Sequence, residues 1–235
     1  LPDDPMFPDA AAKKTALSDA YDAEADPLET DGVQLTIGTS GDVLLQSLDT
    51  YATVDTTWAS HLNGMTFSLA KRLKQVASIL RNGTTGARFF HVRLGGFDTH
   101  TNQGVLSGRQ PDLLDKLSRA LKAFYDDTVD LGIANKVLTL TFSEFGRRVA
   151  ENGSSPATSG TDHGAASVLF ALGGAVVGDV YGTVPKLDDL DKGNLKFHTD
   201  FRQVYATAID KWLASPGAHV PLLPGGPYAT LGFLP

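Results

Sequence analysis

Two short segments of the chain pair an aspartate with a histidine, and these four side chains are the first candidates for chemistry. Asp98 and His100 are two residues apart, and Asp162 and His163 are adjacent between glycine-containing flanks. Residues two apart in extended chain point the same way, so Asp98 and His100 can meet one cation. Adjacent residues diverge on a regular strand, but a glycine-flanked loop lets them converge on one ion or serve two. The competing interpretations are a polar surface turn at Asp98, a cap at Asp162 and packing of His163.

Together the two pairs form a ligand set of imidazole nitrogens and carboxylate oxygens. Such a set suits zinc, manganese or another hard-to-borderline divalent ion. We expect a divalent metal, with zinc favoured and manganese or calcium as alternatives. Two ions about 4 Å apart would clamp a phosphoryl group or a similar ester. The chain has no cysteine, which excludes thiolate ligands and a cysteine nucleophile.

Three further charged residues follow a predicted strand: Glu144, Arg147 and Arg148. Glu144 is a candidate ligand, orienting group or base, and its alternative is a salt bridge to one of the arginines. The arginines can hold an oxyanion in bidentate fashion, and their alternative is structural pairing with acids. We take Glu144 and Arg147 as the candidate catalytic residues.

The remaining histidines carry less chemical signal. His198 and Asp200 open the last predicted helix, where Asp200 is expected to be an N-cap for Gln203 and its neighbours rather than a ligand. We interpret three histidines as structural or surface residues: His61, His91 and His219.

Hydrophobic periodicity predicts the elements that must position these residues. Apolar residues at helical spacing predict helices over 65–81, 112–131 and 200–214, with weaker ones over 9–22 and 42–53. Apolar runs predict strands over 87–94, 136–142 and 167–173. We expect one α/β domain over 42–235, preceded by an irregular acidic leader over 1–41.

A strand, a long helix and another strand form a βαβ pattern. This pattern predicts an α/β fold with a parallel or mixed sheet flanked by helices. In open parallel sheets, ligands bind beyond the carboxyl ends of the strands. The segments around Asp98 and Glu144 follow the first two predicted strands, so we expect them to meet at one edge of the sheet.

The acidic charge of the chain is concentrated near its start. The 235 residues include 27 acids and 20 bases, a net charge of −7. Residues 1–31 hold nine acids and two bases, so they account for the whole excess. A neutral body without a basic stripe argues against nucleic acid as a partner. With no apolar run of about 18 residues, no membrane span is expected, and no signal peptide is apparent.

Four segments carry a more specific pattern. In chain order they are Gly95-Gly96-Phe97-Asp98-Thr99-His100-Thr101-Asn102-Gln103, residues 141–153, Gly160-Thr161-Asp162-His163-Gly164-Ala165, and residues 199–205. This pattern resembles the bacterial DUF1501 family over about residues 65–215. That family is similar to the alkaline phosphatase and sulfatase superfamily.

The resemblance implies an alkaline-phosphatase-like fold, in which an Asp…His pair and an Asp-His pair bind a dinuclear metal centre. Carried over residue by residue, it implies Asp98, His100, Asp162 and His163 as metal ligands. It also implies export, often through a twin-arginine signal, to the periplasm, the cell surface or the medium.

The chain departs from the family pattern in two ways. Family members are usually about twice as long, and their N-terminal half is expected to carry a strand, a metal-binding Asp and a Ser/Thr nucleophile. Nothing before Asp98 resembles that region, so the chain resembles a C-terminal half that needs the missing half or a second copy as partner. The superfamily's last histidine ligand has no clear counterpart, although His198 or Asp200 could replace it.

Two functions remain open at this point. The first is a metal-dependent hydrolase of phosphate or sulfate esters that acts on a small-molecule or polymeric ester. The second is a non-catalytic, exported module of the same fold for metal binding or surface assembly.

Overall fold

The computed structural model describes residues 54–55, 57–83, 86–153, 155 and 158–235. The chain divides into two compact units, of which Ala59–Lys74 with His91–Pro235 carries the residues of interest. In the other unit, the Trp58 indole N–H donates to Ser78 Oγ at 2.8 Å, and Arg81 lies over the Trp58 ring. The predicted acidic leader over 1–41 and the predicted helices over 9–22 and 42–53 lie outside the described residues.

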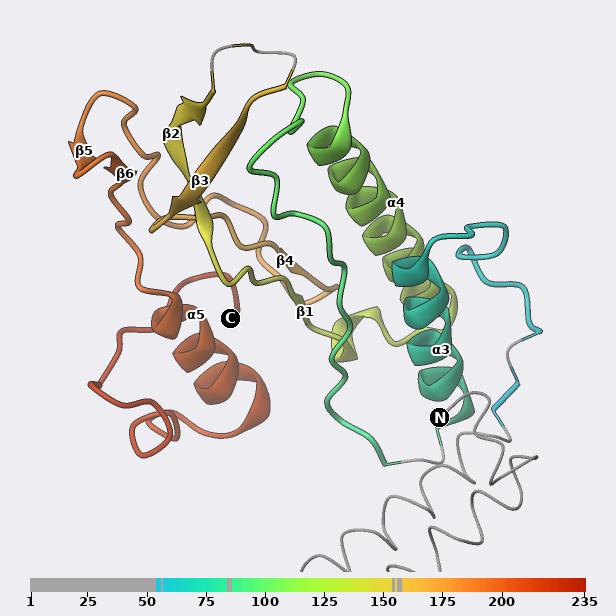
Figure 1. The fold of residues 1–235 in the computed structure, drawn as a ribbon. Helices are drawn as coiled ribbons and strands as arrows, with labels where there is room; N and C mark the ends of the chain where they lie inside the picture. The colour runs from blue at the N-terminus through green and yellow to red at the C-terminus, as the bar shows by residue number, and fades with distance from the viewer. Residues whose placement is uncertain (1–53, 56, 84–85, 154, 156–157) are drawn as a thin grey trace, which may run out of the picture. The chain divides into compact units, whose positions relative to one another are not determined.

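The described elements alternate between helices and short strands (Figure 1). The helical elements are α3 (Ser68–Asn82), α4 (Arg109–Asp130), η1 (Ala134–Lys136), α5 (Phe201–Ala208) and η2 (Ile209–Leu213). The strands are β1 (Thr139–Leu140), β2 (Gly146–Asn152), β3 (Gly160–Gly164), β4 (Ala171–Leu172), β5 (Leu190–Asp191) and β6 (Asn194–Leu195).

The helix predictions over 65–81 and 112–131 are confirmed by α3 and α4, whose ends differ from the prediction by one to three residues. In α4, the apolar stripe buries Leu113, Ala120 and Phe124. Periodicity of this kind is a local property of the sequence, which is why the prediction succeeds.

The predicted helix over 200–214 is also confirmed, with one change of geometry. α5 continues into η2, a π-helical turn that ends where Ala214 N–H donates to the Ile209 carbonyl. The predicted cap is present, because Asp200 accepts from the Arg202 backbone N–H at 2.9 Å and Gln203 Oε1 accepts from the Asp200 N–H at 3.1 Å. This reciprocal arrangement is a capping box, so Asp200 serves to start the helix.

Strands β1 to β4 form one long antiparallel hairpin (Figure 1). β1 pairs with β4 through Thr139↔Leu172 and Leu140↔Ala171. The register then shifts by one residue before Gly146↔Gly164, and β2 pairs with β3 as far as Asn152↔Gly160 with an irregularity between Arg147 and Glu151. The hydrogen bond from Thr141 N–H to the Phe170 carbonyl, at 2.9 Å, continues the pairing beyond β1 and β4. The chain therefore leaves the base of the hairpin through β1, turns after β2, and returns through β3 and β4.

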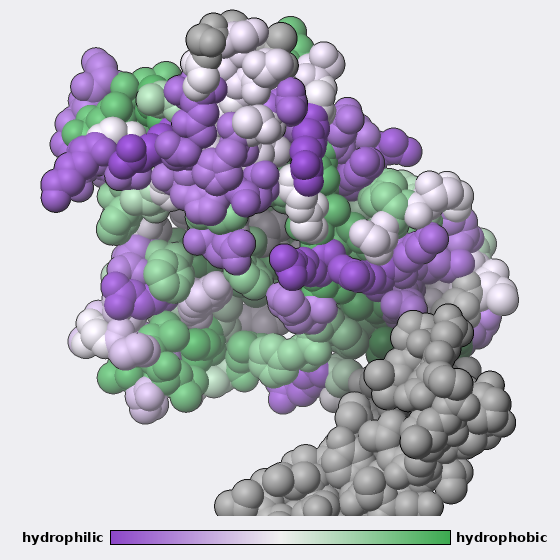
Figure 2. Space-filling model, in the orientation of Figure 1, coloured by the Kyte–Doolittle hydropathy of each residue, from purple (hydrophilic) through white to green (hydrophobic). Residues whose placement is uncertain are grey.

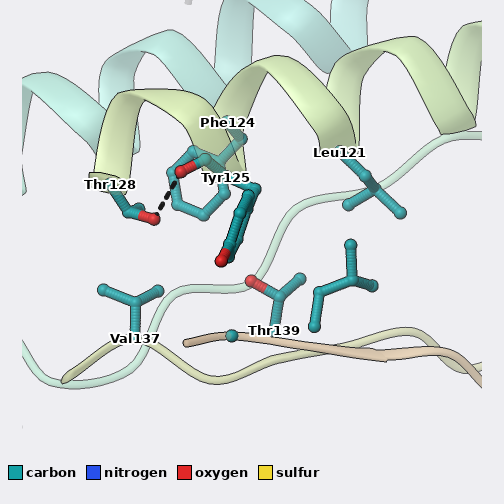
Figure 3. A pocket seen from close by; sticks show the side chains of 8 residues that line it. Leu121, Phe124, Tyr125, Thr128, Val137 and Thr139 are labelled. Carbon is teal, nitrogen blue, oxygen red and sulfur yellow. Dashed lines mark hydrogen bonds between the residues drawn. The ribbon is translucent and has the colours of Figure 1, made fainter. Parts of the chain in front are cut away.

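The base of this hairpin lies between two helical layers. On one side, Val137, Thr139 and Leu172 face Leu121 and Tyr125 of α4 around a small pocket (Figure 3). On the other side, a cluster of Val204, Phe233 and Leu234 is buried, and the partly buried residues packed against it include Leu138, Leu140, Leu169 and Ala171. Alternate residues of the hairpin thus bury opposite faces, as the two-residue period of a strand requires.

The predicted parallel sheet is not what the described residues form. All strand pairs among them are antiparallel, in three two-stranded sheets. The strands predicted over 136–142 and 167–173 are present only as the two-residue strands β1 and β4. They pair antiparallel as the two arms of a hairpin, and no parallel strands joined by a βαβ crossover are formed among the described residues. The strand predicted over 87–94 is not formed, because no described segment pairs with it. The apolar run over 87–94 is present in the sequence, but a strand also needs a hydrogen-bonded neighbour.

The exposed surface shows two kinds of region (Figure 2). Hydrophilic side chains gather over the β2–β3 hairpin, whereas hydrophobic ones gather near α5 and the chain that follows it. The exposed apolar residues there include Phe201, Val220 and Leu222. Among the described helices, none combines the length and the hydropathy that a membrane crossing requires.

Candidate metal centre

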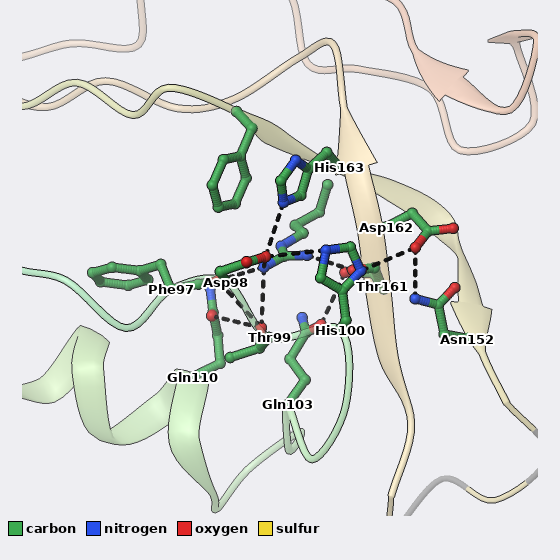
Figure 4. Close-up of polar contacts among 12 residues, drawn as sticks. Phe97, Asp98, Thr99, His100, Gln103, Gln110, Asn152, Thr161, Asp162 and His163 are labelled. Carbon is green, nitrogen blue, oxygen red and sulfur yellow. Dashed lines mark hydrogen bonds and ion pairs between the residues drawn. The ribbon is translucent and has the colours of Figure 1, made fainter.

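Three ligand-type atoms from distant parts of the sequence converge next to the β2–β3 hairpin (Figure 4). Asp98 Oδ1 lies 2.8 Å from His163 Nε2 and 3.1 Å from His100 Nε2. Ligand atoms of the three residues all lie within 4.8 Å of one another, and no other group of three acidic, histidine or cysteine residues does so in the described part of the chain. All three side chains are about half exposed, at 60% for Asp98, 46% for His100 and 48% for His163.

The segment that carries Asp98 and His100 lies along β3 as an additional extended chain. Thr101 bridges to Ser159, Gln103 N–H donates to the Ser159 carbonyl at 3.0 Å, and Thr161 N–H donates to the Thr99 carbonyl at 3.3 Å. This antiparallel pairing places residues 98–100 alongside residues 160–162, so the two Asp/His segments meet across a strand edge. The arrangement brings together the two pairs that the sequence analysis treats as one ligand set, although the strands that join them are antiparallel.

Gly160 makes this close approach possible. A Cβ atom at this position would lie 2.1 Å from the Thr99 carbonyl oxygen and 2.4 Å from the carbonyl carbon of His100. Real Cβ atoms do not come so near to a backbone, so any larger residue would push the Asp98–His100 segment away from β3. The glycine is therefore part of how the chain positions its candidate ligands.

Phe145 orients the His163 ring. The two rings are stacked with centroids 3.8 Å apart and planes 5° from parallel. Phe145 immediately precedes β2, and His163 on β3 pairs with Arg147 of β2. The hairpin register thus sets Phe145 against His163, and the stack limits rotation of the imidazole about its χ angles.

His100 lies between two carboxylates (Figure 4). Its Nε2 faces Asp98 Oδ1 and its Nδ1 faces Asp162 Oδ1, each at 3.1 Å. Asp162 Oδ1 also accepts from the Asn152 side-chain amide at 2.7 Å. The structure therefore brings all four predicted ligand residues into one cluster, but Asp162 stands outside the group of three converging atoms.

Hydrogen bonds keep both aspartates ionised. The pKa of Asp98 is lowered, chiefly by its hydrogen bond with His163 and further by the neighbouring His100 and Arg147. The pKa of Asp162 is lowered first by the Asn152 amide and then by His100. Because a carboxylate binds a cation only when ionised, both groups are in the form that a metal site needs at neutral pH.

Arg147 joins the two ligand-bearing segments. Its guanidinium donates to the backbone carbonyls of Phe97 and Thr161, and also to Thr99 Oγ1 at 3.3 Å. The side chain is only 18% exposed, and it lies 3.8 Å from Asp98 Oδ1 and over the ring of Phe145. Its donors are largely engaged with the protein, so Arg147 is arranged as a structural tie rather than as a free oxyanion clamp.

The other predicted charged residues, Glu144 and Arg148, are not among the three converging ligand residues, although the charge of Arg148 helps to lower the pKa of Asp162. Glu144 is exposed, and no hydrogen bond or ion pair joins it to another described residue. Arg148 donates to the Lys192 carbonyl at 3.1 Å, which connects β2 to the turn between β5 and β6. The alternative interpretation of Glu144, a salt bridge to Arg147 or Arg148, is not formed among the described residues.

The geometry fits a small divalent ion. Tetrahedral bonds of about 2.0–2.1 Å place neighbouring ligand atoms about 3.3 Å apart, close to the separations of 2.8 and 3.1 Å at Asp98 Oδ1. Two imidazole nitrogens and one carboxylate oxygen are the donors that zinc and similar ions accept. Asp98, His100 and His163 could therefore hold one ion with little rearrangement.

Several supporting residues were not singled out from the sequence. Asn152 holds Asp162, Phe145 stacks on His163, and Gln103 Oε1 accepts from Thr161 Oγ1 at 2.8 Å. The buried Thr99 receives Arg147, as described above. Their signal was weak, because each is an ordinary polar or aromatic residue whose role depends on a partner far away in the sequence.

Comparison with known proteins gives one finding. No curated protein and no solved structure matches the chain. The family described as "Protein of unknown function (DUF1501)" matches residues 60–213, which is more than half of the chain and includes α3, α4, the long hairpin and α5. The chain therefore belongs to the DUF1501 family.

Proposed function

We propose that this protein is a metal-dependent hydrolase of phosphate or sulfate esters. The observation that carries the proposal is the convergence of Asp98 Oδ1, His100 Nε2 and His163 Nε2 beside the β2–β3 hairpin. Structural zinc sites are closed by four protein ligands, whereas catalytic sites use three and leave a position open. Three ligands on half-exposed side chains match the second pattern.

The residues have distinct roles in this proposal. Asp98, His100 and His163 would hold the ion, with zinc preferred and manganese or calcium as alternatives. A divalent ion supplies a Lewis acid that polarises an ester oxygen and acidifies water. Arg147 keeps the two ligand segments together through the carbonyls of Phe97 and Thr161, and these contacts favour a positioning role over direct contact with substrate.

The wider context of the proposal comes from the family resemblance. The similarity of DUF1501 proteins to the alkaline phosphatase and sulfatase superfamily supports ester hydrolysis and export to the periplasm, the cell surface or the medium. It also supports a further part, an N-terminal half or a second copy, that would supply a nucleophile and a second metal site. Within the described residues, the ligand atoms themselves support one ion.

A non-catalytic role in metal binding or surface assembly is the second candidate. The exposed apolar residues near α5, including Phe201 at 56% and Leu222 at 64%, favour it, because such residues are common at contact surfaces. In that case the ion would stabilise the meeting of residues 98–100 with β3, and no ester would be cleaved.

Metal titration and an ester assay test the proposal. Calorimetric titration with Zn²⁺ should show one ion per chain, and the metal-loaded protein should cleave nitrophenyl phosphate or nitrophenyl sulfate. His163→Ala should abolish both properties. His91→Ala is the matched control, because His91 is exposed, contacts Phe142 and lies outside the cluster. Binding without cleavage would favour the second candidate. Absence of binding would contradict the hydrolase and a non-catalytic metal-binding role, and would leave surface assembly as the remaining form of the second candidate.

A further inference from the structure

The two aspartates of the cluster are placed differently around His100. Asp98 faces Nε2, the nitrogen that converges with His163, whereas Asp162 faces Nδ1 on the other side of the ring. The two nitrogens of one imidazole point in divergent directions. A single ion in reach of Nε2 therefore cannot also be in reach of the Asp162 oxygen that lies against Nδ1.

We infer that Asp162 is a positioning residue that acts on the metal site through His100, and is not itself a ligand of the ion. This inference rests on the proposed function, because it assigns a role within the same site. It revises the ligand set implied by the family resemblance, in which Asp162 binds metal directly.

The tautomer that a metal bound at Nε2 would require of His100 fits this assignment. An imidazole that binds metal through Nε2 offers its lone pair there and carries its proton on Nδ1. The acceptor next to Nδ1 is Asp162 Oδ1, at 3.1 Å. The carboxylate would thus select the tautomer, fix the plane of the ring and make Nε2 a stronger donor to the metal.

Asp162 is itself held in place for this role. The Asn152 side-chain amide donates to the same oxygen at 2.7 Å, from the strand paired with β3. The irregular register of β2 between Arg147 and Glu151 lies opposite Asp162. The chain of contacts therefore runs from Asn152 to Asp162, to His100 and to the shared point beside Asp98 (Figure 4).

Affinity for Co²⁺ alone, followed by visible absorption, tests the inference. Asp162→Ala should weaken binding about 10–100-fold, the range found for outer partners of metal ligands. Asp162→Asn keeps an amide oxygen that accepts from Nδ1, so it should restore part of the affinity. Asp98→Ala, which removes a ligand, should cost more than either. Asp115→Ala is the matched control, because Asp115 is an exposed carboxylate on α4 that pairs with Arg119.

Two spectroscopic measurements separate a positioning role from a general structural one. X-ray absorption should count the same protein ligands in wild type and Asp162→Ala, and one fewer in Asp98→Ala. Nitrogen NMR of metal-loaded wild type should show His100 protonated on Nδ1. An Asp162→Ala affinity equal to wild type, or a lost oxygen ligand in that variant, would overturn the inference.

The result also separates this inference from the proposed function. If wild type binds Co²⁺ but cleaves no ester, the hydrolase proposal fails and the role of Asp162 is still decided by affinity. If wild type binds no divalent ion, both fail together.

Discussion

Two of the places where the protein brings histidine and aspartate together differ in almost every physical respect. His219 and Asp210 are buried, each with a side chain 6% exposed. In contrast, Asp98, His100 and His163 are about half exposed and converge on one point. The same two residue types therefore have different roles, a structural one in the buried pair and a candidate metal-binding one in the exposed group. The two sites are distinguished by their burial and by whether their hydrogen-bonding groups are all occupied.

The buried pair has no capacity left for a ligand. His219 Nδ1 lies 2.7 Å from Asp210 Oδ2, and its Nε2 accepts from the Tyr228 backbone N–H at 3.0 Å. Asp210 also accepts from the backbone N–H groups of Gly217 and His219, both at 2.9 Å. Burial opposes ionisation of Asp210, but these donors outweigh it and lower its pKa. The pair fastens the loop after η2, which confirms the structural interpretation of His219.

The largest expected effect comes from breaking the buried pair. His219→Ala leaves the Tyr228 N–H and part of Asp210 without partners, so the free energy of unfolding should fall by about 3 kcal/mol. Urea unfolding followed by circular dichroism measures the change. Under conditions where the variant is still folded, its Zn²⁺ affinity should equal that of wild type. A variant as stable as wild type would contradict the structural role of this pair.

Removing an exposed ligand should give the opposite result. His163→Ala should weaken Zn²⁺ binding more than ~100-fold, beyond the cost of losing an outer partner. The metal-free variant should unfold within about 0.5 kcal/mol of the metal-free wild type, because exposed side chains contribute little to stability. Titration calorimetry and urea unfolding on the same samples give both numbers. A strong loss of stability in the metal-free variant would show that His163, like His219, has a structural role.

A third variant tests how the exposed cluster is assembled. Gly160→Ala should cost about 2 kcal/mol in stability, because the new methyl group meets the Thr99 carbonyl oxygen at 2.1 Å. It should also weaken metal binding, since Thr99 is flanked by Asp98 and His100. Gly178→Ala is the matched control, because a Cβ there meets nothing within 4 Å. Equal stability of the two variants would show that the close approach at Gly160 is dispensable.

The smallest expected change in stability concerns Asp200, whose side chain is less exposed than the Asp98 cluster and more exposed than the buried His219–Asp210 pair. Asp200 pairs with Arg202, with side chains 26% and 37% exposed, and this hydrogen bond lowers the pKa of Asp200. A lowered pKa means that the stabilisation is present above the unfolded-state value near 3.8 and is lost as the pH falls through the folded-state value.

Asp200→Ser keeps a good N-cap but removes the charge. The variant should be less stable than wild type by about 0.5 kcal/mol at pH 7, a value typical of solvent-screened pairs. The difference should shrink as the pH falls below 3.8. Thermal unfolding from pH 7 to pH 2 measures it, and a difference that grows in acid would contradict the assigned direction.

The local features of this protein could be predicted from its sequence. The helices α3, α4 and α5 follow the apolar periodicity, and Asp200 caps α5 as its position before Gln203 indicates. The two Asp/His segments were also recognisable as candidates from residue type and spacing. These features depend on residues a few positions apart, because helical hydrogen bonds and caps join near neighbours.

The tertiary structure decided what those segments became. Asp98 and His163 are 65 residues apart, and Asp162 and His100 are 62 apart. Their contacts depend on how the segment that carries Asp98 and His100 pairs along β3, in an antiparallel arrangement that replaces the predicted parallel sheet. The pairing of β2 with β3 brings the Arg147 guanidinium to the carbonyls of Phe97 and Thr161. Asp162 lies next to Nδ1 of His100, on the opposite side of the ring from Asp98. The pairing of distant strands depends on the whole chain and not on any short segment of the sequence. Residue types and spacing could therefore identify the candidate residues, but only the tertiary structure shows which of them are placed as ligands and which as supporting residues.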